Sequence, residues 1–596
     1  MLKIITKFIN GSMGKSLRAV VLSSFLVFTL FSYSLLVQNV TAGRLFTLQD
    51  QATANPQEKI PAQDNQDTTD AEDSTDTIDQ IKPSIKRITS HNVASDPRFC
   101  VGYDQLTRSI TVSCKTANLS HVDNVLKNPA VLKKEGDGVW LLNANLTIAD
   151  GADFNVNSTD TKWLKINSTT SADAYHIDVI GNMKVDSVKI SSWNTTSNNY
   201  TATDGKIHRA SLAVLPEASG KTNITNSEIS HLGYGTSLRQ GLSYYGGDGS
   251  LLRNNTIHHL WYGFYSKGIG NMTIEDNNIY ANVKYGVDPH TGTHDMIIRN
   301  NRVHENEGLG IVCSFDCTNI IMEGNEVHGN KLAGIMLSRN VMDSAVRNNT
   351  IYDEVKGIVI SESHKDNIYN NTVSDSDIGI EAKFGSSKNN IHNNSILQAA
   401  KYGIQMVKGA TENTVMHNNV IDSTKYGICV YNNGTGNMII ENSIVRAGGH
   451  AICVYDKSSG NEIKSNSINQ ASGYGIYVTD SDANNNTFVG NQIRMAKVGI
   501  SVSNNTGSVF TQNNIGVVKD SEYFISDNST VRLANTSFSS DQIRASDGGQ
   551  NSISVSDSGT VDISNKAGNK TTFDTNKSIY SAVLPDRESI TIRTVK

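Results

Sequence analysis

A carboxylate and an imidazole lie two residues apart in the segment YGVDPH, residues 285–290. In an extended strand, residues i and i+2 point to the same face, so Asp288 and His290 can meet a ligand together. Histidine is a frequent general base because its unperturbed pKa lies near neutral pH. Pro289 removes a donor from a strand ladder, and such an irregularity in a regular repeat is typical of a functional site. A solvated surface pair would show the same spacing, so the segment alone leaves both interpretations open.

A repeat of 22 to 24 residues determines where this segment lies. A glycine followed by a β-branched or aromatic residue recurs through the middle of the chain, and Ala451 takes its place once. The glycines are Gly241, Gly263, Gly286, Gly310, Gly334, Gly357, Gly379, Gly403, Gly427, Gly475 and Gly499. A fixed period of this length predicts a solenoid. The β-branched runs, the Asn-rich turns and the lack of helical periodicity predict an all-β fold, a right-handed parallel β-helix.

Alternation within each repeat predicts which side chains face the interior. The residues one and three positions after each glycine are mostly apolar and should point inward, whereas those two and four positions after it should point outward. The outward pairs include Tyr265/Lys267, Asp288/His290 and Glu381/Lys383. Parallel strands stack about 4.8 Å apart, so we expect Lys267 beside His290 and Tyr265 beside Asp288. Arg339, one residue beyond its strand, should lie two coils further along.

Four segments resemble the mannuronan C5-epimerases of the alginate pathway. They are NSEISHLGYGTSLRQGLSYY (226–245), WYGFYSKG (261–268), YGVDPH (285–290) and LAGIMLSRNVMDSAVRNN (332–349). The resemblance spans roughly residues 108–396 and is closest to the periplasmic, metal-independent type of epimerase. It implies a polyuronate polysaccharide as substrate, conversion of mannuronate to guluronate within the polymer, and no metal ion or cofactor.

The resemblance also implies catalytic roles. C5 epimerisation removes a proton α to a carboxylate and returns one to the opposite face of the sugar, so it needs a base, an acid and a cation. By resemblance, His290 is the base and Arg339 neutralises the substrate carboxylate. Asp288 orients His290 or hydrogen-bonds to the sugar. Tyr285 or a water molecule supplies the proton on the opposite face.

Three further outward residues are expected to bind substrate: Lys267, which would pair with a substrate carboxylate, and Tyr265 and Lys383. The sequence departs from the family pattern in two ways. The periplasmic enzymes read DPHD, whereas residue 291 is threonine, so one carboxylate is missing unless Asp295 replaces it. An additional coil, residues 309–317, also separates the arginine from the histidine.

The N-terminus predicts the compartment. Basic residues precede an apolar run at 19–37, and Val-Thr-Ala at 40–42 resembles a cleavage site. The run is about as long as a bilayer span, so residues 1–42 are expected to be either a cleaved signal peptide or a membrane anchor. Either way, the remainder should be secreted or exposed at the cell surface. Residues 43–90, which are acidic and polar, are expected to form a disordered linker.

Composition and cysteine positions add further expectations. The formal net charge of −6 shows no basic surface, so nucleic acid is not expected as a partner. We expect a β region at 91–144, the β-helix at 145–505 and a β cap or small β-domain at 506–596. Three cysteine pairs are close enough to form disulfides: Cys100/Cys114, Cys313/Cys317 and Cys429/Cys453.

Three functions fit the sequence. The first is the extracytoplasmic polyuronate C5-epimerase. The second is a polysaccharide lyase, which would use the same base and the same cation but would expel the 4-O substituent by β-elimination. The third is a non-catalytic surface β-helix that binds glycans. The segment YGVDPH with Lys267 beside it favours the two enzymes, because a purely structural solenoid does not need these side chains.

Overall fold

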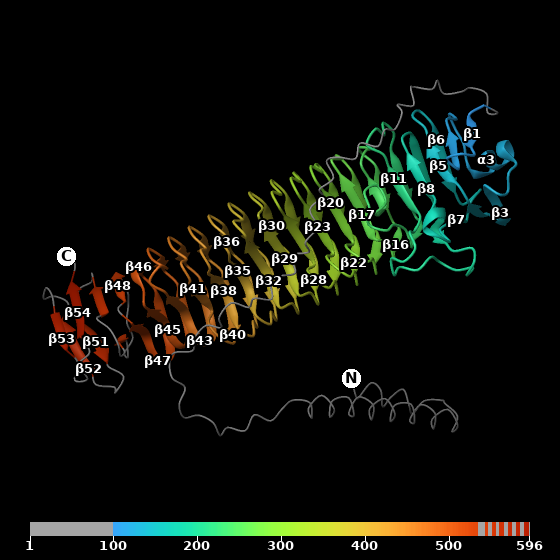
Figure 1. Cartoon of the computed structure of the whole chain (residues 1–596). Coiled ribbons are helices and arrows are strands. Elements are labelled where there is room, and N and C mark those ends of the chain that lie inside the picture. Colours follow the sequence, from blue (N-terminus) through green and yellow to red (C-terminus); the bar gives the residue numbers. More distant parts are fainter. Residues whose placement is uncertain are drawn as a thin grey trace, which may run out of the picture. The chain divides into compact units, whose positions relative to one another are not determined.

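The computed structural model describes residues 99–527 and 529–534, followed by the backbone of the strands between Ile543 and Thr594. The predicted segments at 1–42 and 43–90 lie outside the described residues. The described chain forms an all-β solenoid whose coils stack along one axis (Figure 1). This confirms the predicted fold class.

Three parallel ladders make up the solenoid. The first ladder consists of β2 (Ser109–Val112), β5 (Asn145–Ile148), β8 (His176–Val179), β11 (Ser211–Val214), β14 (Gly241–Tyr244), β17 (Tyr262–Lys267), β20 (Val287–His290), β23 (Ile311–Ser314), β26 (Ile335–Ser338), β29 (Lys356–Ser361), β32 (Ile378–Lys383), β35 (Tyr402–Met406), β38 (Tyr426–Val430), β41 (Ile452–Val454), β43 (Ser467–Thr479), β45 (Gln492–Ser503), β47 (Asn514–Ser526), β49 (Ile543–Ala545) and β51 (Thr560–Ser564).

The second ladder consists of β6 (Asp153–Asn157), β9 (Asn182–Asp186), β12 (Thr222–Thr225), β15 (Leu251–Arg253), β18 (Thr273–Glu275), β21 (Ile297–Arg299), β24 (Ile321–Glu323), β27 (Ala345–Arg347), β30 (Asn367–Tyr369), β33 (Asn390–His392), β36 (Thr414–Met416), β39 (Met438–Ile440), β42 (Glu462–Lys464), β44 (Thr487–Val489), β46 (Thr506–Thr511), β48 (Thr530–Ala534), β50 (Asn551–Val555) and β54 (Ser589–Thr594).

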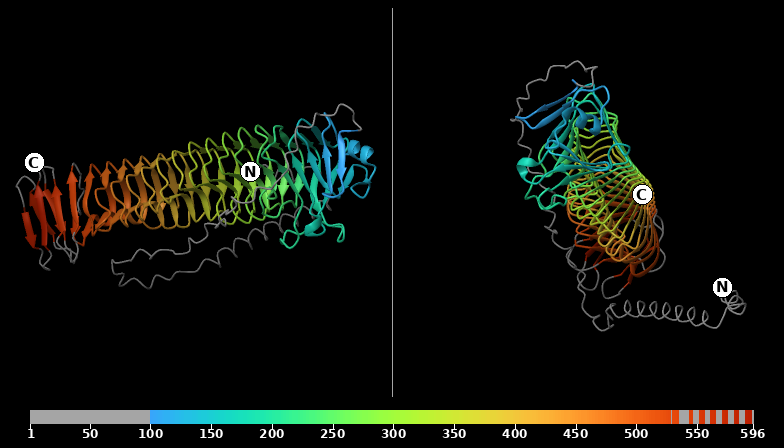
Figure 2. Two further views of the ribbon diagram at one scale, coloured as in Figure 1. Left: turned by 45° about the horizontal axis from the view of Figure 1, so that its top comes forward. Right: turned by 90° about the vertical axis from the view of Figure 1, so that its right-hand side faces the viewer.

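The third ladder consists of β4 (Val139–Leu142), β7 (Trp163–Asn167), β10 (Lys189–Trp193), β13 (Glu228–Ser230), β16 (Thr256–His258), β19 (Asn278–Tyr280), β22 (Arg302–His304), β25 (Glu326–His328), β28 (Thr350–Tyr352), β31 (Thr372–Ser374), β34 (Ser395–Leu397), β37 (Asn419–Ile421) and β40 (Ser443–Ala447), and then merges into β43, β45 and β47. From β13 to β42, each coil therefore contributes one strand to each ladder. The right-hand view of Figure 2 shows the coils stacked behind one another.

The remaining elements lie near the two ends of the solenoid. β1 (Val101–Asp104) pairs antiparallel with β2, and β3 (Leu132–Gly136) with β4. β52 (Lys570–Asp574) and β53 (Tyr580–Val583) form antiparallel pairs with β51 and β54. The helices are α3 (Leu119–Leu126) and the short 3-10 helix η1 (Ser171–Asp173). Within the described part of the chain, neither helix has the length and hydrophobicity needed to cross a membrane.

Parallel pairing is not confined to residues 145–505. β2 already pairs with β5 before this range, and β46 pairs with β48 at its end. The predicted alternation within the repeat is confirmed, because Ile335, Ile404 and Ile476 are fully buried.

The recurring glycines reflect close packing between coils. A Cβ atom built on Gly310 would lie 2.6 Å from the carbonyl oxygen of Gly334 and 2.7 Å from Cγ1 of Val327. Contacts this short leave no room for a side chain. The repeating glycines therefore lie at the positions where one coil packs closely against the next.

Columns of buried asparagines hold the turns together, as their recurrence in the sequence predicts. The column between the second and third ladders contains Asn255, Asn277, Asn301, Asn325, Asn349, Asn371, Asn394, Asn418, Asn442, Asn466, Asn491 and Asn513. Each amide donates to the side-chain oxygen of the next, and the backbone N–H of Asn325 also donates to Asn349, at 2.9 Å. These bonds satisfy polar groups that could not reach water.

Replacing Asn325 with alanine should therefore destabilise the solenoid. The change leaves the side-chain amide and the backbone N–H of Asn301 without their acceptor, and the carbonyl of Ile298 without its donor. We expect a loss of at least about 3 kcal/mol of unfolding free energy, since each buried unsatisfied group costs about 1–3 kcal/mol. Thermal unfolding checks this. Thr350→Ala, at an exposed strand position, should have little effect, and equal midpoints for the two variants would contradict the prediction.

Two of the three candidate cysteine pairs form disulfides. Cys100 is bonded to Cys114, and Cys429 to Cys453 in the neighbouring coil. Cys313 and Cys317 are instead buried free thiols. The Cys317 thiol donates to the carbonyl of Ser314, at 3.3 Å.

Candidate active site

The register of β17 against β20 brings the predicted site residues together. Tyr265 pairs with Asp288 and Lys267 with His290, both in the parallel register expected from the repeat. The Lys267 side chain is exposed, whereas Asp288 and His290 are largely buried at this outer face. The predicted neighbour relations are thus confirmed, and an imidazole, a carboxylate and an ammonium group lie on one ladder.

The His290 ring is held on both sides by aromatic rings. The ring centroids of Tyr265 and Phe315 lie 5.5 Å and 5.0 Å from its own. Its Nδ1 lies 2.6 Å from the hydroxyl oxygen of Thr291. In the tautomer in which Nδ1–H donates to Thr291, the other nitrogen, Nε2, is left as the proton acceptor.

Thr291 is a hydrogen-bond partner of the histidine, whereas the carboxylate of Asp295 bonds to other residues. The Asp295 carboxylate lies 2.7 Å from Nδ1 of His294 and accepts a hydrogen bond from Asn319. These bonds keep the pKa of Asp295 below its usual value. The structure therefore does not place Asp295 where it could replace the carboxylate that the family pattern has after the histidine.

Arg339 lies two coils from His290, as the sequence predicts. His290 pairs with Ser314, and Ser314 pairs with Ser338, the residue before Arg339. The Arg339 guanidinium lies 4.6 Å from the centroid of the Phe315 ring. Phe315 therefore contacts both the candidate base and the candidate cation.

Phe315 is not predicted by the alternation along the strands. It lies five positions after Gly310, in the turn that follows β23, and its backbone has a φ of 59°. Its signal in the sequence is the succession Thr291, Phe315, Arg339 at the fifth position after the glycine in successive coils.

A chain of tyrosines leads away from His290 across the face. The centroid of Tyr265 lies 5.6 Å from that of Tyr262, which in turn lies 5.4 Å from that of Tyr285. Tyr285 precedes Gly286 and so lies at the opposite end of the strand from His290. The two candidate proton-transfer groups, Tyr285 and His290, thus flank the same stretch of the outer face.

Lys383 lies apart from these residues. It follows in the same outward column as His290, Ser314, Ser338 and Ser361, which places it four coils beyond the histidine. Four coils correspond to about 19 Å. Its ammonium group lies 3.8 Å from the carboxylate of Glu381, and both side chains are buried. The structure therefore brings six of the seven predicted site residues to one region, and Lys383 to another.

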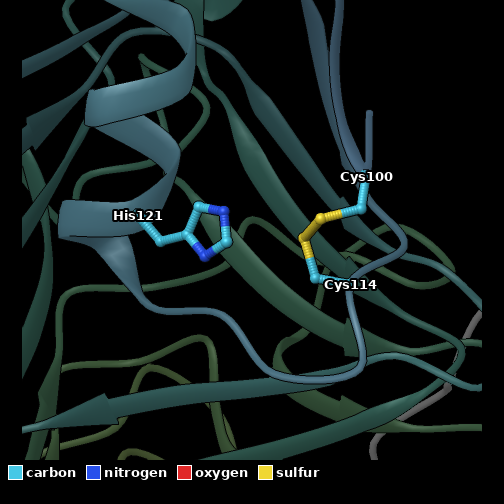
Figure 3. A group of neighbouring side chains, drawn as sticks. All are labelled: Cys100, Cys114 and His121. Carbon is cyan, nitrogen blue, oxygen red and sulfur yellow. A yellow bond between two sulfur atoms is a disulfide. The ribbon is translucent and has the colours of Figure 1, made fainter. Parts of the chain in front are cut away.

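One group of described residues has a composition typical of metal ligands. The side chains of Cys100, Cys114 and His121 converge near the N-terminal end of the solenoid (Figure 3). The two sulfur atoms are bonded to each other, so they are not thiolates that could bind a metal ion. The group thus fits a structural disulfide beside a histidine.

Two hollows of the described surface lie elsewhere. One, of about 750 Å³, is lined by residues that include Tyr103, Arg108 and Tyr175. The other, of about 550 Å³, includes Lys331, Glu354 and other residues of turns between the third and first ladders. Neither of these two hollows is lined by a predicted site residue.

The family model described as "Right handed beta helix region" matches residues 188–351, 315–444 and 433–580. The chain therefore belongs to the right-handed β-helix family. No curated protein matches the sequence significantly. Among solved structures, the chain is similar to the periplasmic alginate epimerase AlgG, with 20% identity and a TM-score of 0.49 over 59% of this chain and 84% of the other. It is also similar to the A-module of the Azotobacter vinelandii mannuronan C-5 epimerase AlgE4, with 14% identity and a TM-score of 0.28 over 63% of this chain and 89% of the other.

Proposed function

We propose that the protein is a polysaccharide-modifying β-helix enzyme, and that its reaction is the C5 epimerisation of a polyuronate, converting mannuronate to guluronate. The observation that carries this proposal is the pairing of β17 with β20. It places Lys267 beside His290 and Tyr265 beside Asp288 on one outward face.

In the proposed mechanism, Nε2 of His290 accepts the proton from C5 of the sugar. The electron pair moves toward the carboxylate, and Arg339 and Lys267 offset the negative charge that develops there. Tyr285 or a water molecule then donates a proton to C5 from the opposite face, which inverts the centre. Thr291 holds the His290 ring through Nδ1, and Phe315 keeps the Arg339 guanidinium on the same side of the face.

The lyase remains the second candidate, because the same base and the same cations would serve β-elimination. Incubation with polymannuronate distinguishes the candidates. Guluronate signals in proton NMR without new ultraviolet absorbance support the epimerase, whereas absorbance from unsaturated ends supports the lyase. Binding without either product would support the glycan-binding protein.

We further propose that the enzyme acts outside the cytoplasm, in the periplasm, in the medium or at the cell surface. The support is the apolar run at 19–37 with its basic flank. Membrane retention by this segment is the alternative to its cleavage. Mass spectrometry of the mature N-terminus distinguishes the two.

Activity should persist in the presence of a chelator. In the proposed mechanism the positive charges come from Arg339 and Lys267, so no divalent cation is required. The measurement is turnover of polymannuronate with EDTA and after addition of calcium. Inactivation by EDTA that calcium reverses would contradict this expectation.

Replacing Arg339 with lysine should lower turnover by about 10- to 100-fold, although the charge is kept. A guanidinium can bind a carboxylate through two parallel hydrogen bonds while it stacks on the Phe315 ring. An ammonium group cannot make both of these contacts. Arg347→Lys is the matched control, because Arg347 pairs with Glu323 on the second ladder. Unchanged kcat/KM in Arg339→Lys would remove Arg339 from the mechanism.

A further inference from the structure

The hollow of about 550 Å³ beside the turns between the third and first ladders is lined mainly by polar side chains. Four of the lining residues are acidic: Asp353, Glu354, Asp375 and Asp377. Glu354 lies just before β29, which is three coils beyond the strand that carries His290. The hollow is therefore separate from the candidate active site.

Glu354 is the buried member of this acidic group, since only 4% of its surface is exposed. One carboxyl oxygen, Oε1, accepts hydrogen bonds from the backbone N–H and the side-chain amide of Asn330, at 3.3 Å and 2.7 Å. The other oxygen, Oε2, is buried and has no hydrogen-bond partner among the described residues. Buried polar atoms in proteins are normally hydrogen-bonded, so Oε2 indicates a place for a ligand that can donate to it.

The hollow forms where the column of buried asparagines before the first ladder is interrupted. In that column Asn306 donates to Asn330, and Asn330 donates to Glu354. The same place in the next coil belongs to Ser376, because β28 and β31 pair in register beside it. The Ser376 hydroxyl is shorter than a carboxamide and donates to the carbonyl of Ser374, at 3.1 Å. The carboxyl of Glu354 is thus the last group of this row of side-chain hydrogen bonds.

Two of the acidic side chains, Asp353 and Asp375, have no ion-pair partner within 4.0 Å in the part of the chain that the structure describes. Both are exposed turn residues, with φ of 56° and 51°, at equivalent places in adjacent coils. Adjacent coils are about 4.8 Å apart, so two like charges lie side by side. Asp377 and Lys331, which also line the hollow, are each paired with a residue of opposite charge outside it. The hollow therefore carries a surplus of negative charge, which attracts a cation.

The arrangement of these groups favours an organic cation over a single metal ion. No three carboxylate oxygens of the described acidic residues lie within 4.8 Å of one another, whereas a calcium ion gathers about six to eight oxygen ligands around one point. The hollow is also lined by Val355, an apolar side chain that is 47% exposed. Separate ammonium groups can donate to separate carboxylates, and the methylene groups between them can cover the valine.

We propose that this hollow binds a linear polyamine, a chain of methylene groups that carries two or more ammonium groups. One ammonium group donates to Oε2 of Glu354, and another lies between the carboxylates of Asp353 and Asp375. The site does not depend on the proposed function, because it contains no residue of the candidate active site. A ligand that binds only the folded protein stabilises it, so polyamines should also raise the unfolding midpoint.

Binding should release a proton from Glu354. Burial, with a smaller contribution from the charge of Asp353, raises the pKa of the Glu354 carboxyl to about 8. This carboxyl is therefore mostly protonated at pH 7, and a cation beside it favours the charged form. The other charged groups that line the hollow are Asp375, Asp377 and Lys331. Affinity should increase as the pH rises from about 6.5 to 8, since alkylamines with a pKa near about 10 stay charged over this range.

The test is isothermal titration calorimetry with spermidine, putrescine and butylamine, in about 0.15 M salt to screen weak surface attraction. The two polyamines should bind at one site, at least about 5-fold more tightly than butylamine, which has a single ammonium group. Glu354→Gln should weaken spermidine binding at least about 10-fold at pH 8, because hydrogen bonds to a charged group are the stronger kind. Asp353→Asn with Asp375→Asn should weaken it about 3- to 30-fold, the range for two exposed ion pairs. Asp276→Asn, at an exposed turn residue with a φ of 57° between the second and third ladders, is the matched control and should bind as the parent does.

Titration at pH 7 in two buffers with different ionisation enthalpies measures the proton that binding releases. The parent should release a proton and Glu354→Gln should not. Absence of binding by both polyamines, or equal binding by the parent and the acidic variants, would overturn the proposal. Binding of calcium that Glu354→Gln abolishes, without binding of polyamines, would overturn it in favour of a metal ion. None of these results bears on the epimerase, which is tested with polymannuronate.

Discussion

Replacing His290 with alanine should reduce turnover of polymannuronate by about 10²- to 10⁴-fold, the usual cost of losing a general base. The side chain lies on the outer face and contacts Tyr265, Phe315 and Thr291, none of which belongs to the solenoid interior. The unfolding midpoint should therefore change little. The measurements are guluronate formation by NMR and a thermal unfolding curve.

His294→Ala is the matched control for this prediction. His294 lies four residues further along, is partly exposed and contacts Asp295 rather than the candidate site. Its removal should leave turnover near that of the wild type. A folded His290→Ala protein with wild-type turnover would exclude His290 as the base and make Tyr285 the next candidate.

Replacing Asp366 with asparagine should stabilise the protein at pH 8 by about 3–5 kcal/mol, because burial raises the pKa of this carboxyl to about 8. Asp366 occupies a place in another asparagine column, which lies before the second ladder and continues with Asn389 and Asn413. One oxygen accepts from the backbone N–H of Ser344 at 2.9 Å, while the other, buried oxygen has no hydrogen-bond partner among the described residues. An asparagine would supply an amide donor there, as Asn389 does to the carbonyl of Ser363.

The same shift predicts how stability depends on pH. The unfolded chain releases this proton near pH 4, whereas the folded protein keeps it until about pH 8. Between these values the folded carboxyl keeps a proton that the unfolded chain has lost, so this group makes stability fall as the pH rises. Below about pH 6.5 the buried histidines His231 and His450, whose pKa values burial lowers to about 3 and about 4, contribute the opposite slope, so the fall should be seen from about pH 7 to pH 8. Glu354 takes the place of an asparagine in the column that lies before the first ladder. Burial raises the pKa of Glu354 to about 8 as well, so this carboxyl should make the fall of stability with pH steeper.

Unfolding measured from pH 7 to pH 8, where the histidines of the unfolded chain have lost most of their protons, checks this second prediction. Asp366→Asn and Glu354→Gln should each make the unfolding free energy fall less steeply with pH. The double variant should show almost no fall. Thr350→Ala, at an exposed position that carries no titratable group, is the control and should leave the slope unchanged. An equally steep decline in the double variant would show that other groups cause it.

Much of the fold could be predicted because every coil of a solenoid repeats the same local pattern of residues. The glycine period predicted the length of a coil, and the alternation predicted which residues point inward. Together they predicted that Lys267 pairs with His290. Each of these features depends only on residues within one coil and on a constant step between coils. In the described solenoid most strands pair with the strand one coil away, so the topology follows from the period.

The features that sequence reasoning missed depend on side-chain direction. The position of Phe315 between His290 and Arg339 follows from a left-handed turn residue, and alternation along a strand does not extend into that turn. The column of Lys383 was identified correctly, but its ionic contact with Glu381 depends on rotamers. The free thiols Cys313 and Cys317 show likewise that proximity in sequence does not fix bonding.

The constant step between coils has an evolutionary consequence. Because every coil offers the same upper and lower surface to its neighbours, gaining or losing one whole period leaves the rest of the architecture intact. The coil containing β23 lies between the strands of His290 and Ser338, and such a duplication would shift the arginine from the histidine by one step of about 4.8 Å. The distance between two side chains on the same face of the solenoid can thus change in discrete increments of one coil.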